Sequence, residues 1–454
     1  MSIERAAPEP VPALGPLCTR AREGRARCHA IRVSRAVQRL KRVSSRRFIR
    51  ARGLPLLELA RVHDRARGEQ TGSATPRLRA LARAPHRAYV ALVRALPPAV
   101  AAHLESLFPG SRVTSARRLG DDAHPEGETA KELGYGSVVK VALALPDGGA
   151  RTLVVHVPRP DEFGHDRRAD RVAAVVLALD DFGAVPRHVR AIDAGVMRAG
   201  AVPVSLRDTG EPYLVTEWAD GELYADDLRR VARAGVATPR DLARIDVLAR
   251  YLAELHRGRG GAPAAYVRAI RDLVGDGEGI AGLADSYGDD VPGAPRARIE
   301  ALEAACLRWR HRLRRRTDRL RRTHGDFHPF NLLFDGEASL VVLDASRGGE
   351  GDPADDVAAL SINLLFFGLD HRDGWKGGLG VLWERFWTGY LSASEDREVL
   401  DVIAPFYAWR ALVVASPRWY PHLSSEDRDR ILRFAERALE APRFDPAWGP
   451  EAMR

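Results

Sequence analysis

The sequence predicts an α+β protein with two lobes, a small β-rich lobe followed by a larger helical lobe, and a basic extension before them. The chain has 454 residues, which is more than a single hydrophobic core usually supports. Strand-like runs gather between positions 112 and 218, and helical periodicity dominates from position 219 onward. The extension is basic because residues 1–53 carry 14 Lys and Arg against three Glu.

Composition excludes several classes of protein. With 45% hydrophobic and 29% charged residues, the chain can bury a core, which excludes a disordered or collagen-like protein. No apolar run approaches the roughly 18–20 residues of a transmembrane helix. The three cysteines, Cys18, Cys28 and Cys306, lack metal-ligand spacing, so neither a disulfide framework nor a zinc site is indicated. We therefore expect a cytoplasmic protein without a membrane partner.

The basic leader is predicted to span residues 1–75 and to be poorly ordered or built of frayed helices, because its apolar periodicity is weak. Almost all positive residues of the chain are arginines, and the lysines are only Lys41, Lys131, Lys140 and Lys376. The preference for arginine over lysine holds throughout the chain and is not specific to the leader. The only support for nucleic-acid binding by the leader is the clustering of its positive charges, so we expect no nucleic-acid partner.

The small lobe is expected at residues 112–218, after a helical preface at 76–111. In the preface, Pro97 and Pro98 restart a helix that ends at Pro109 and Gly110. The lobe itself is predicted to hold strands at 137–145 and 152–157 joined by a turn, a helix at 166–181, and strands at 189–196 and 213–216.

The large lobe is expected at residues 219–441, with a tail at 442–454. Its clearest helices are predicted at 242–256 and 297–313, and a loop-rich insertion is predicted at 275–295. The charge run from Arg310 to Arg322 is most simply an exposed helical face.

One segment of the large lobe has the residues that phosphoryl transfer needs. Asp326 is followed five residues later by Asn331, and Asp344 ends the next predicted strand. A carboxylate is needed to orient and deprotonate an attacking hydroxyl, and oxygen ligands are needed to hold Mg²⁺ on nucleotide phosphates. We predict that Asp326 is the catalytic base and that Asn331 and Asp344 are the metal ligands. The alternative is a simple turn at 324–326 with Asp344 as a helix cap.

This segment resembles the aminoglycoside phosphotransferase and choline kinase-like family. The resemblance lies in His324-Gly325-Asp326 with Asn331, in Asp344, and in Gly351-Asp352-Pro353 followed by Asp356. It covers roughly residues 112–441. It implies a bilobal protein-kinase-like fold, ATP and Mg²⁺ as cofactors, and a small-molecule hydroxyl as phosphate acceptor.

The resemblance also implies nucleotide contacts in the small lobe. Residues 213–221 resemble the family's hinge, where Glu217, Trp218 and Ala219 would meet adenine; an ordinary strand end is the alternative. Gly134 and Gly136 resemble a loop that covers phosphates, but the third glycine is missing, and a plain turn is the alternative.

One departure concerns the family's phosphate-binding lysine, whose position is occupied here by His156. Arg159 is the next candidate cation, and Asp170 is the best candidate for the carboxylate that pairs with the cation. Because side chains alternate along a strand, Lys140 is expected on the face opposite to that of Val139 and Val141. The two valines would face the nucleotide if the glycine loop is aligned correctly.

The remaining assignments describe supporting roles. His324 is expected to hold the catalytic loop, His328 to be structural or close to the acceptor, and Asp352 to cap the following helix. The acceptor pocket is expected within residues 262–298, and a cationic aminoglycoside is not favoured there. The alternative function is a nucleotide-binding pseudokinase with a regulatory role, for which His156 is the main support.

Overall fold

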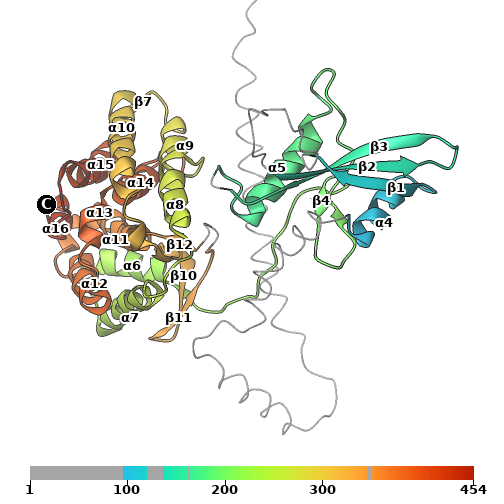
Figure 1. The fold of residues 1–454 in the computed structure, drawn as a ribbon. Coiled ribbons are helices and arrows are strands. Elements are labelled where there is room, and N and C mark those ends of the chain that lie inside the picture. Colours follow the sequence, from blue (N-terminus) through green and yellow to red (C-terminus); the bar gives the residue numbers. More distant parts are fainter. Residues whose placement is uncertain (1–95, 120–135, 162, 346, 348) are drawn as a thin grey trace, which may run out of the picture. The chain divides into compact units, whose positions relative to one another are not determined.

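The computed structural model describes residues 96–119 and 136–454, except 162, 346 and 348. The predicted basic leader and Gly134 lie outside these residues. Figure 1 shows the elements, whose bounds are α4 (Pro98–Ser106), β1 (Arg112–Arg118), β2 (Gly136–Ala144), β3 (Ala150–Pro158), α5 (Arg168–Asp181), β4 (Gly195–Val196), β5 (Val204–Ser205), β6 (Glu222–Leu223), α6 (Tyr224–Ala234), α7 (Pro239–Leu255), α8 (Pro263–Gly275), α9 (Ile280–Asp285), β7 (Asp290–Val291), β8 (Ala294–Pro295), α10 (Arg296–Leu313), β9 (Arg321–Arg322), β10 (Leu332–Asp335), β11 (Ser339–Val342), β12 (Glu350–Gly351), α11 (Ala354–Gly368), α12 (Leu379–Ser394), α13 (Val399–Val402), α14 (Ala404–Val414), α15 (Ser425–Glu440) and α16 (Trp448–Ala452).

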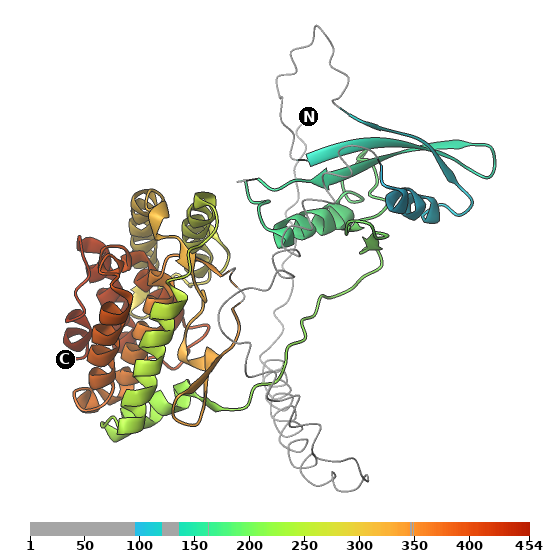
Figure 2. The ribbon, with the colours of Figure 1, turned by 60° about the horizontal axis from the view of Figure 1, so that its bottom comes forward.

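The small lobe is built on an antiparallel sheet with the strand order β1-β2-β3. Strands β2 and β3 form the predicted hairpin, with register from Gly136 opposite Pro158 to Ala144 opposite Ala150. Figure 2 shows this sheet as a long, curved ribbon. Strand β1 was not predicted, because five of its seven residues are polar or charged in a run that lacks an apolar alternation.

Helix α4 covers one face of this sheet. Val100 and Leu104 of α4 form a buried cluster with Val139 and Val141 of β2. Because side chains alternate along a strand, the odd-numbered residues of β2 face the helix and the even-numbered residues lie on the opposite face. This alternation decides which residues of the hairpin are accessible to a ligand.

The two later strands predicted for the small lobe are largely absent. Only Gly195–Val196 of the predicted strand at 189–196 is extended, and it pairs with β5. The prediction of a buried strand at 213–216 is wrong: Tyr213, Leu214 and Val215 are irregular and 90%, 88% and 79% exposed. A short apolar run becomes a strand only where a neighbouring strand pairs with it, and no described strand does so here.

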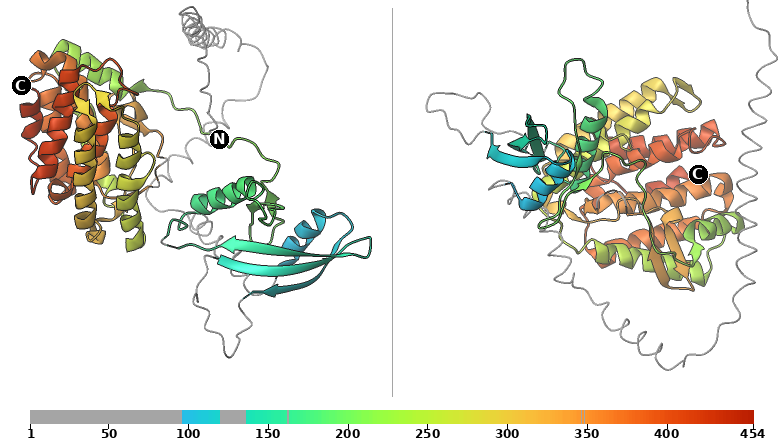
Figure 3. Two further views of the ribbon diagram at one scale, coloured as in Figure 1. Left: turned by 90° about the horizontal axis from the view of Figure 1, so that it is seen from above. Right: turned by 90° about the vertical axis from the view of Figure 1, so that its right-hand side faces the viewer.

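The large lobe is a bundle of helices around α11. In Figure 3, the yellow helices α8–α10 and the orange-to-red helices α11–α15 pack as one bundle. Most of α11 is buried on every side, as expected for a helix that is apolar all round. The last residues belong to this bundle as well, since Phe444 and Met453 are buried and α16 packs on α15.

The predicted insertion at 275–295 is more regular than the sequence suggested. It contains α9 and the small β7–β8 hairpin, and Ile280, Tyr287 and Ala294 are buried in the main core. The loop prediction followed the high density of Gly and Asp, which hid the apolar residues between them. No helix in the described part of the chain is long and apolar enough to cross a membrane.

Candidate active site

The predicted catalytic loop lies between β9 and the β10–β11 hairpin, and its backbone is held by a buried carboxylate. Asp356 at the start of α11 accepts hydrogen bonds from the backbone N–H groups of His324 and Gly325, both at 2.8 Å. Gly325 has φ +84°, a left-handed conformation that favours glycine. The sequence His-Gly-Asp therefore forms a tight turn whose geometry is set by α11.

Asp326 projects from this turn into a group of cationic side chains. Its carboxylate accepts a hydrogen bond of 2.6 Å from the Arg410 guanidinium. His328 Nε2 lies 3.5 Å and Arg347 lies 3.8 Å from its other oxygen. Burial favours the neutral acid, but the hydrogen bond from His328 and the charges of Arg410 and Arg347 outweigh it, so the pKa of Asp326 is held below its usual range. Asp326 is therefore ionised at neutral pH.

Arg410 on α14 was not predicted as a site residue. Its buried guanidinium bridges Asp326, the Gly325 carbonyl at 2.9 Å and Asp355 at 2.7 Å. It also stacks on Trp409, 3.9 Å from the ring centroid. Burial raises the pKa of the Asp355 carboxyl to about 6. No local motif marks Arg410, because it lies 84 residues beyond Asp326 in a helix of apolar pattern.

The hairpin brings the two predicted metal ligands to the same end. Leu332 of β10 is opposite Val342 of β11, and the Leu343 N–H donates to the Asn331 carbonyl at 2.8 Å. Asp344 is the next residue and adopts φ +54°, which is uncommon for a side-chain-bearing residue and often marks a functional site.

The side chain of Asn331 is oriented by the catalytic loop. Its Nδ2 donates to the Asp326 carbonyl at 3.1 Å, which leaves its oxygen as an available ligand. Asp344 is exposed. The two residues supply the oxygen donors that Mg²⁺ prefers, and the described residues contain no cluster of three or more His, Cys, Asp or Glu that could hold a metal alone.

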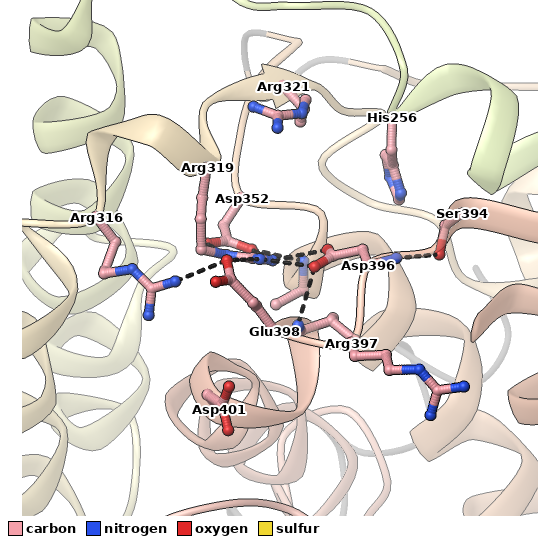
Figure 4. A network of polar contacts seen from close by, with 12 residues as sticks. His256, Arg316, Arg319, Arg321, Asp352, Ser394, Asp396, Arg397, Glu398 and Asp401 are labelled. Carbon is pink, nitrogen blue, oxygen red and sulfur yellow. Dashed lines mark hydrogen bonds and ion pairs between the residues drawn. The ribbon is translucent and has the colours of Figure 1, made fainter. Parts of the chain in front are cut away.

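Asp352 braces the start of α11, and Figure 4 shows its side chain beside Arg319. Its buried carboxylate accepts two hydrogen bonds from Arg319, at 2.9 and 2.8 Å, one from the Tyr266 hydroxyl at 2.8 Å and one from the Ala354 N–H at 3.0 Å. The Ala354 contact makes Asp352 a cap of the helix. Arg319 also binds Asp396 at 2.9 Å, so the prediction that the run 310–322 is an exposed helical face is wrong for this residue.

The two histidines of the motif have different contacts. His324 Nδ1 accepts from the Asp326 N–H at 3.3 Å, while its buried Nε2 has no partner among the described residues. His328 Nδ1 accepts from the Phe330 N–H at 3.2 Å. The proton of His328 is then on Nε2, which is the atom that faces Asp326.

The predicted nucleotide residues of the small lobe lie on both faces of the sheet. Gly136 begins β2. Val141, which was predicted to face the nucleotide, is fully buried against α4 with the other odd-numbered residues of β2. His156 of β3 is on the other face, and burial lowers its pKa. Its imidazole is therefore mostly neutral at pH 7.

Other predicted residues of the small lobe are only partly engaged. Asp170 accepts a hydrogen bond from the Arg167 N–H at 2.8 Å, as part of a cap of α5, and from the Arg268 guanidinium at 2.8 Å. Arg159 follows the end of β3 and is half-buried. Its side chain and that of His156 make no hydrogen bond or ion pair that involves Asp170.

The predicted hinge residues are found in the irregular segment after residue 212. Trp218 is 85% exposed and its indole N–H donates to Asp220 at 2.8 Å. Glu217 is also exposed, and Ala219 is half-buried. Their backbone groups are not used by a strand in the described part of the chain, so a ligand could bind them.

Comparison with known proteins identifies the family. The model of the phosphotransferase enzyme family matches residues 140–396, more than half of the chain, and the protein therefore belongs to this family. No curated protein sequence matches the chain.

Solved structures with similarity to the chain include three small-molecule phosphotransferases. A glucosamine kinase is 19% identical, covers 76% of this chain and 98% of its own, and has a TM-score of 0.34. A macrolide 2'-phosphotransferase type I is 18% identical over 75% and 96%, with a TM-score of 0.25. An aminoglycoside phosphotransferase from Streptomyces rimosus is 14% identical over 60% and 89%, with a TM-score of 0.29. At these values the family assignment rests on the family model.

Proposed function

We propose that the protein transfers the γ-phosphate of ATP to a hydroxyl group of a small molecule. The observation that carries this proposal is the arrangement around Asp326, an ionised carboxylate fixed by Arg410 and His328 beside the loop that carries Asn331. Membership of the phosphotransferase family supports it.

In the proposed reaction, Asp326 accepts a hydrogen bond from the acceptor hydroxyl and orients its oxygen toward the γ-phosphorus. The oxygen–phosphorus bond forms while the bond to the ADP oxygen breaks, and the hydroxyl proton passes to Asp326. A carboxylate of low pKa is a weak base, so we expect it to act chiefly by orientation and to take the proton late. Arg410 keeps this carboxylate in place.

Asn331 and Asp344 would hold Mg²⁺, which when bound neutralises charge on the phosphates. Both residues offer an oxygen at the same end of the β10–β11 hairpin. The joint presence of Asp326, Asn331 and Asp344 disfavours the alternative of a nucleotide-binding pseudokinase.

A transfer assay tests this function. Purified protein is incubated with Mg²⁺ and ATP and a panel of amino sugars, neutral sugars, amino alcohols and aminoglycosides, and phosphorylated products are detected by mass spectrometry. We expect one chemical class to be phosphorylated by the wild type and not by Asp326→Asn. Mg·ATP binding without transfer to any acceptor class would favour the pseudokinase, and absence of Mg·ATP binding would contradict the proposal.

Roles within the site are separated by binding measurements. Asp326→Asn should keep the Mg·ATP affinity of the wild type and lose transfer at least a hundredfold, because Asp326 acts on the acceptor. Asp344→Ala should weaken Mg·ATP binding itself. Calorimetry on both variants decides between these roles, and an equal loss of nucleotide affinity in the two would reject them.

A further inference from the structure

We propose that Lys140 on β2 provides the cation that binds the ATP phosphates in the small lobe. The inference rests on the proposed function and identifies a phosphate-binding residue for it. From the sequence alone, Val141 is expected to face the nucleotide, which would place the Lys140 side chain on the face away from it. The structure reverses this argument.

The faces of the β2–β3 hairpin are fixed by its register and by α4. Val139 and Val141 are buried against α4, so Lys140 points to the opposite face. We call this the open face, which is formed by Val138, Lys140, Ala142, Val154 and His156. Lys140 and Val154 are exposed there, and His156 is partly exposed.

Lys140 and His156 are neighbours on the open face. Lys140 is directly opposite Val154, and His156 is directly opposite Val138. The two residues are therefore in diagonal positions of an antiparallel pair, about 7–8 Å apart at the backbone. A group bound beside His156 lies within reach of the long lysine side chain. Lys140 lies on the strand that begins at Gly136, and His156 is opposite Val138 near the same end of that strand.

His156 alone is poorly suited to hold phosphates. Burial lowers the pKa of its imidazole, and a neutral imidazole offers one donor and no charge. A lysine ammonium group brings a positive charge and three donors, and Lys140 makes no hydrogen bond or ion pair with the described residues. Arg117 lies opposite Lys140 on β1 but has an interaction of its own.

Composition adds a second argument. Of the 70 Lys and Arg residues, four are lysines, so a lysine on the open face departs from the general preference of the chain for arginine. The compact ammonium group binds phosphate as a point charge on a flexible stem, which suits a residue one strand removed from the position that His156 occupies.

Chemical protection tests the assignment in the intact wild-type chain. The protein is treated with a limiting amount of an amine-reactive acetylating reagent in buffer alone, with Mg·ATP or with adenosine. The rate of acetylation of each lysine is then measured by peptide mass spectrometry. We expect Mg·ATP to slow acetylation of Lys140 at least fivefold, and adenosine to have no such effect. Lys376, which is exposed between η4 (Leu369–Gly374) and α12, is the internal control and should be unaffected.

Substitutions provide a second measurement. Lys140→Met should weaken Mg·ATP and Mg·ADP binding at least tenfold, or about 1.4 kcal/mol, with adenosine affinity unchanged, and Lys140→Arg should retain most of the affinity. Arg112→Met is the matched control, since Arg112 is an exposed residue of the same sheet opposite Ala144 at the far end of β2. It should bind as the wild type does.

The outcomes separate this inference from the proposed function. If the wild type binds Mg·ATP while Lys140 is not protected, or while Lys140→Met binds Mg·ATP normally, the assignment of Lys140 is wrong and the proposed function stands. If Lys140→Met loses adenosine affinity equally, the residue is structural and the assignment is also wrong. If the wild type fails to bind Mg·ATP, both proposals are rejected.

Discussion

At the scale of single residues, the site depends on cations that keep one carboxylate ionised and fixed. Arg410 is the central one, because its guanidinium contacts Asp326, Asp355 and the Gly325 carbonyl at once. Only a planar group with several donors can make these three contacts together. Arg410 therefore links the orientation of Asp326 to the position of α14.

Replacement of Arg410 tests this link. We expect Arg410→Gln to lower kcat about 100-fold, since a misplacement of a reacting group by about 1 Å costs roughly that factor. Mg·ATP affinity should not change, and added guanidinium ion should restore part of kcat. Arg410→Lys should restore less, because an ammonium group cannot reproduce the fork.

The control for Arg410 is Arg433→Gln, which removes an exposed arginine of α15 that pairs with Asp429. Its kcat should equal that of the wild type. Loss of Mg·ATP affinity in Arg410→Gln, together with a large drop in melting temperature and no response to guanidinium, would show that Arg410 only stabilises the fold.

At the scale of elements, the sequence predicted what local patterns determine. The β2–β3 hairpin followed from strand runs around a turn, and the contact between Asp326 and Asn331 within one loop is consistent with their short spacing. The strand at 213–216 failed because pairing is a long-range property that an apolar run does not specify.

Sequence analysis did not identify Arg319 and Arg410 as buried partners of the site, because their contacts are also long-range. Arg319 was read as part of an exposed charge run, yet it lies buried between Asp352 and Asp396. Arg410 sits in an apolar helix with no motif around it. Partners 33 and 84 residues apart in sequence are brought together only by the packing of α11 against its neighbours.

The buried pair of Arg319 and Asp352 should dominate the stability of this region. Asp352→Asn weakens two charge-assisted hydrogen bonds from Arg319, which keeps Asp396 as its charged partner, and we expect the free energy of unfolding to fall by about 1.5–3 kcal/mol. The matched control is Asp401→Asn, which breaks a half-exposed pair with Arg443 and should cost about 1 kcal/mol or less. Urea unfolding of both variants provides the comparison. Equal losses would mean that Asp352 acts only as an exchangeable helix cap.

At the scale of the whole molecule, the large lobe contains buried carboxylates that must stay ionised in the folded state. Asp352 is one, and Asp241, which binds Thr238 and Arg230, is another. For both, burial raises the pKa, but the hydrogen bonds and charges of their arginine partners outweigh it and lower the pKa below the ordinary value. Protonation of either group therefore opposes folding.

The sign of the pH dependence follows from these shifts. A carboxyl whose pKa is lower in the folded state stabilises the fold above its unfolded pKa of about 4, and this contribution is lost as the pH falls toward the folded value. We expect the contribution of these two groups to the free energy of unfolding to be steady above about pH 5 and to decrease steeply below pH 4.

Asp352→Asn should be less stable than the wild type at pH 6. Its free energy of unfolding should fall less on acidification, because the substitution removes one of the groups that must be protonated. Urea unfolding at pH values from 2.5 to 6 measures how the free energy of unfolding changes with pH in the wild type and in Asp352→Asn. The control Asp401→Asn is expected to follow the wild type. A variant slope as steep as that of the wild type would show that Asp352 is not among the carboxylates that drive acid unfolding.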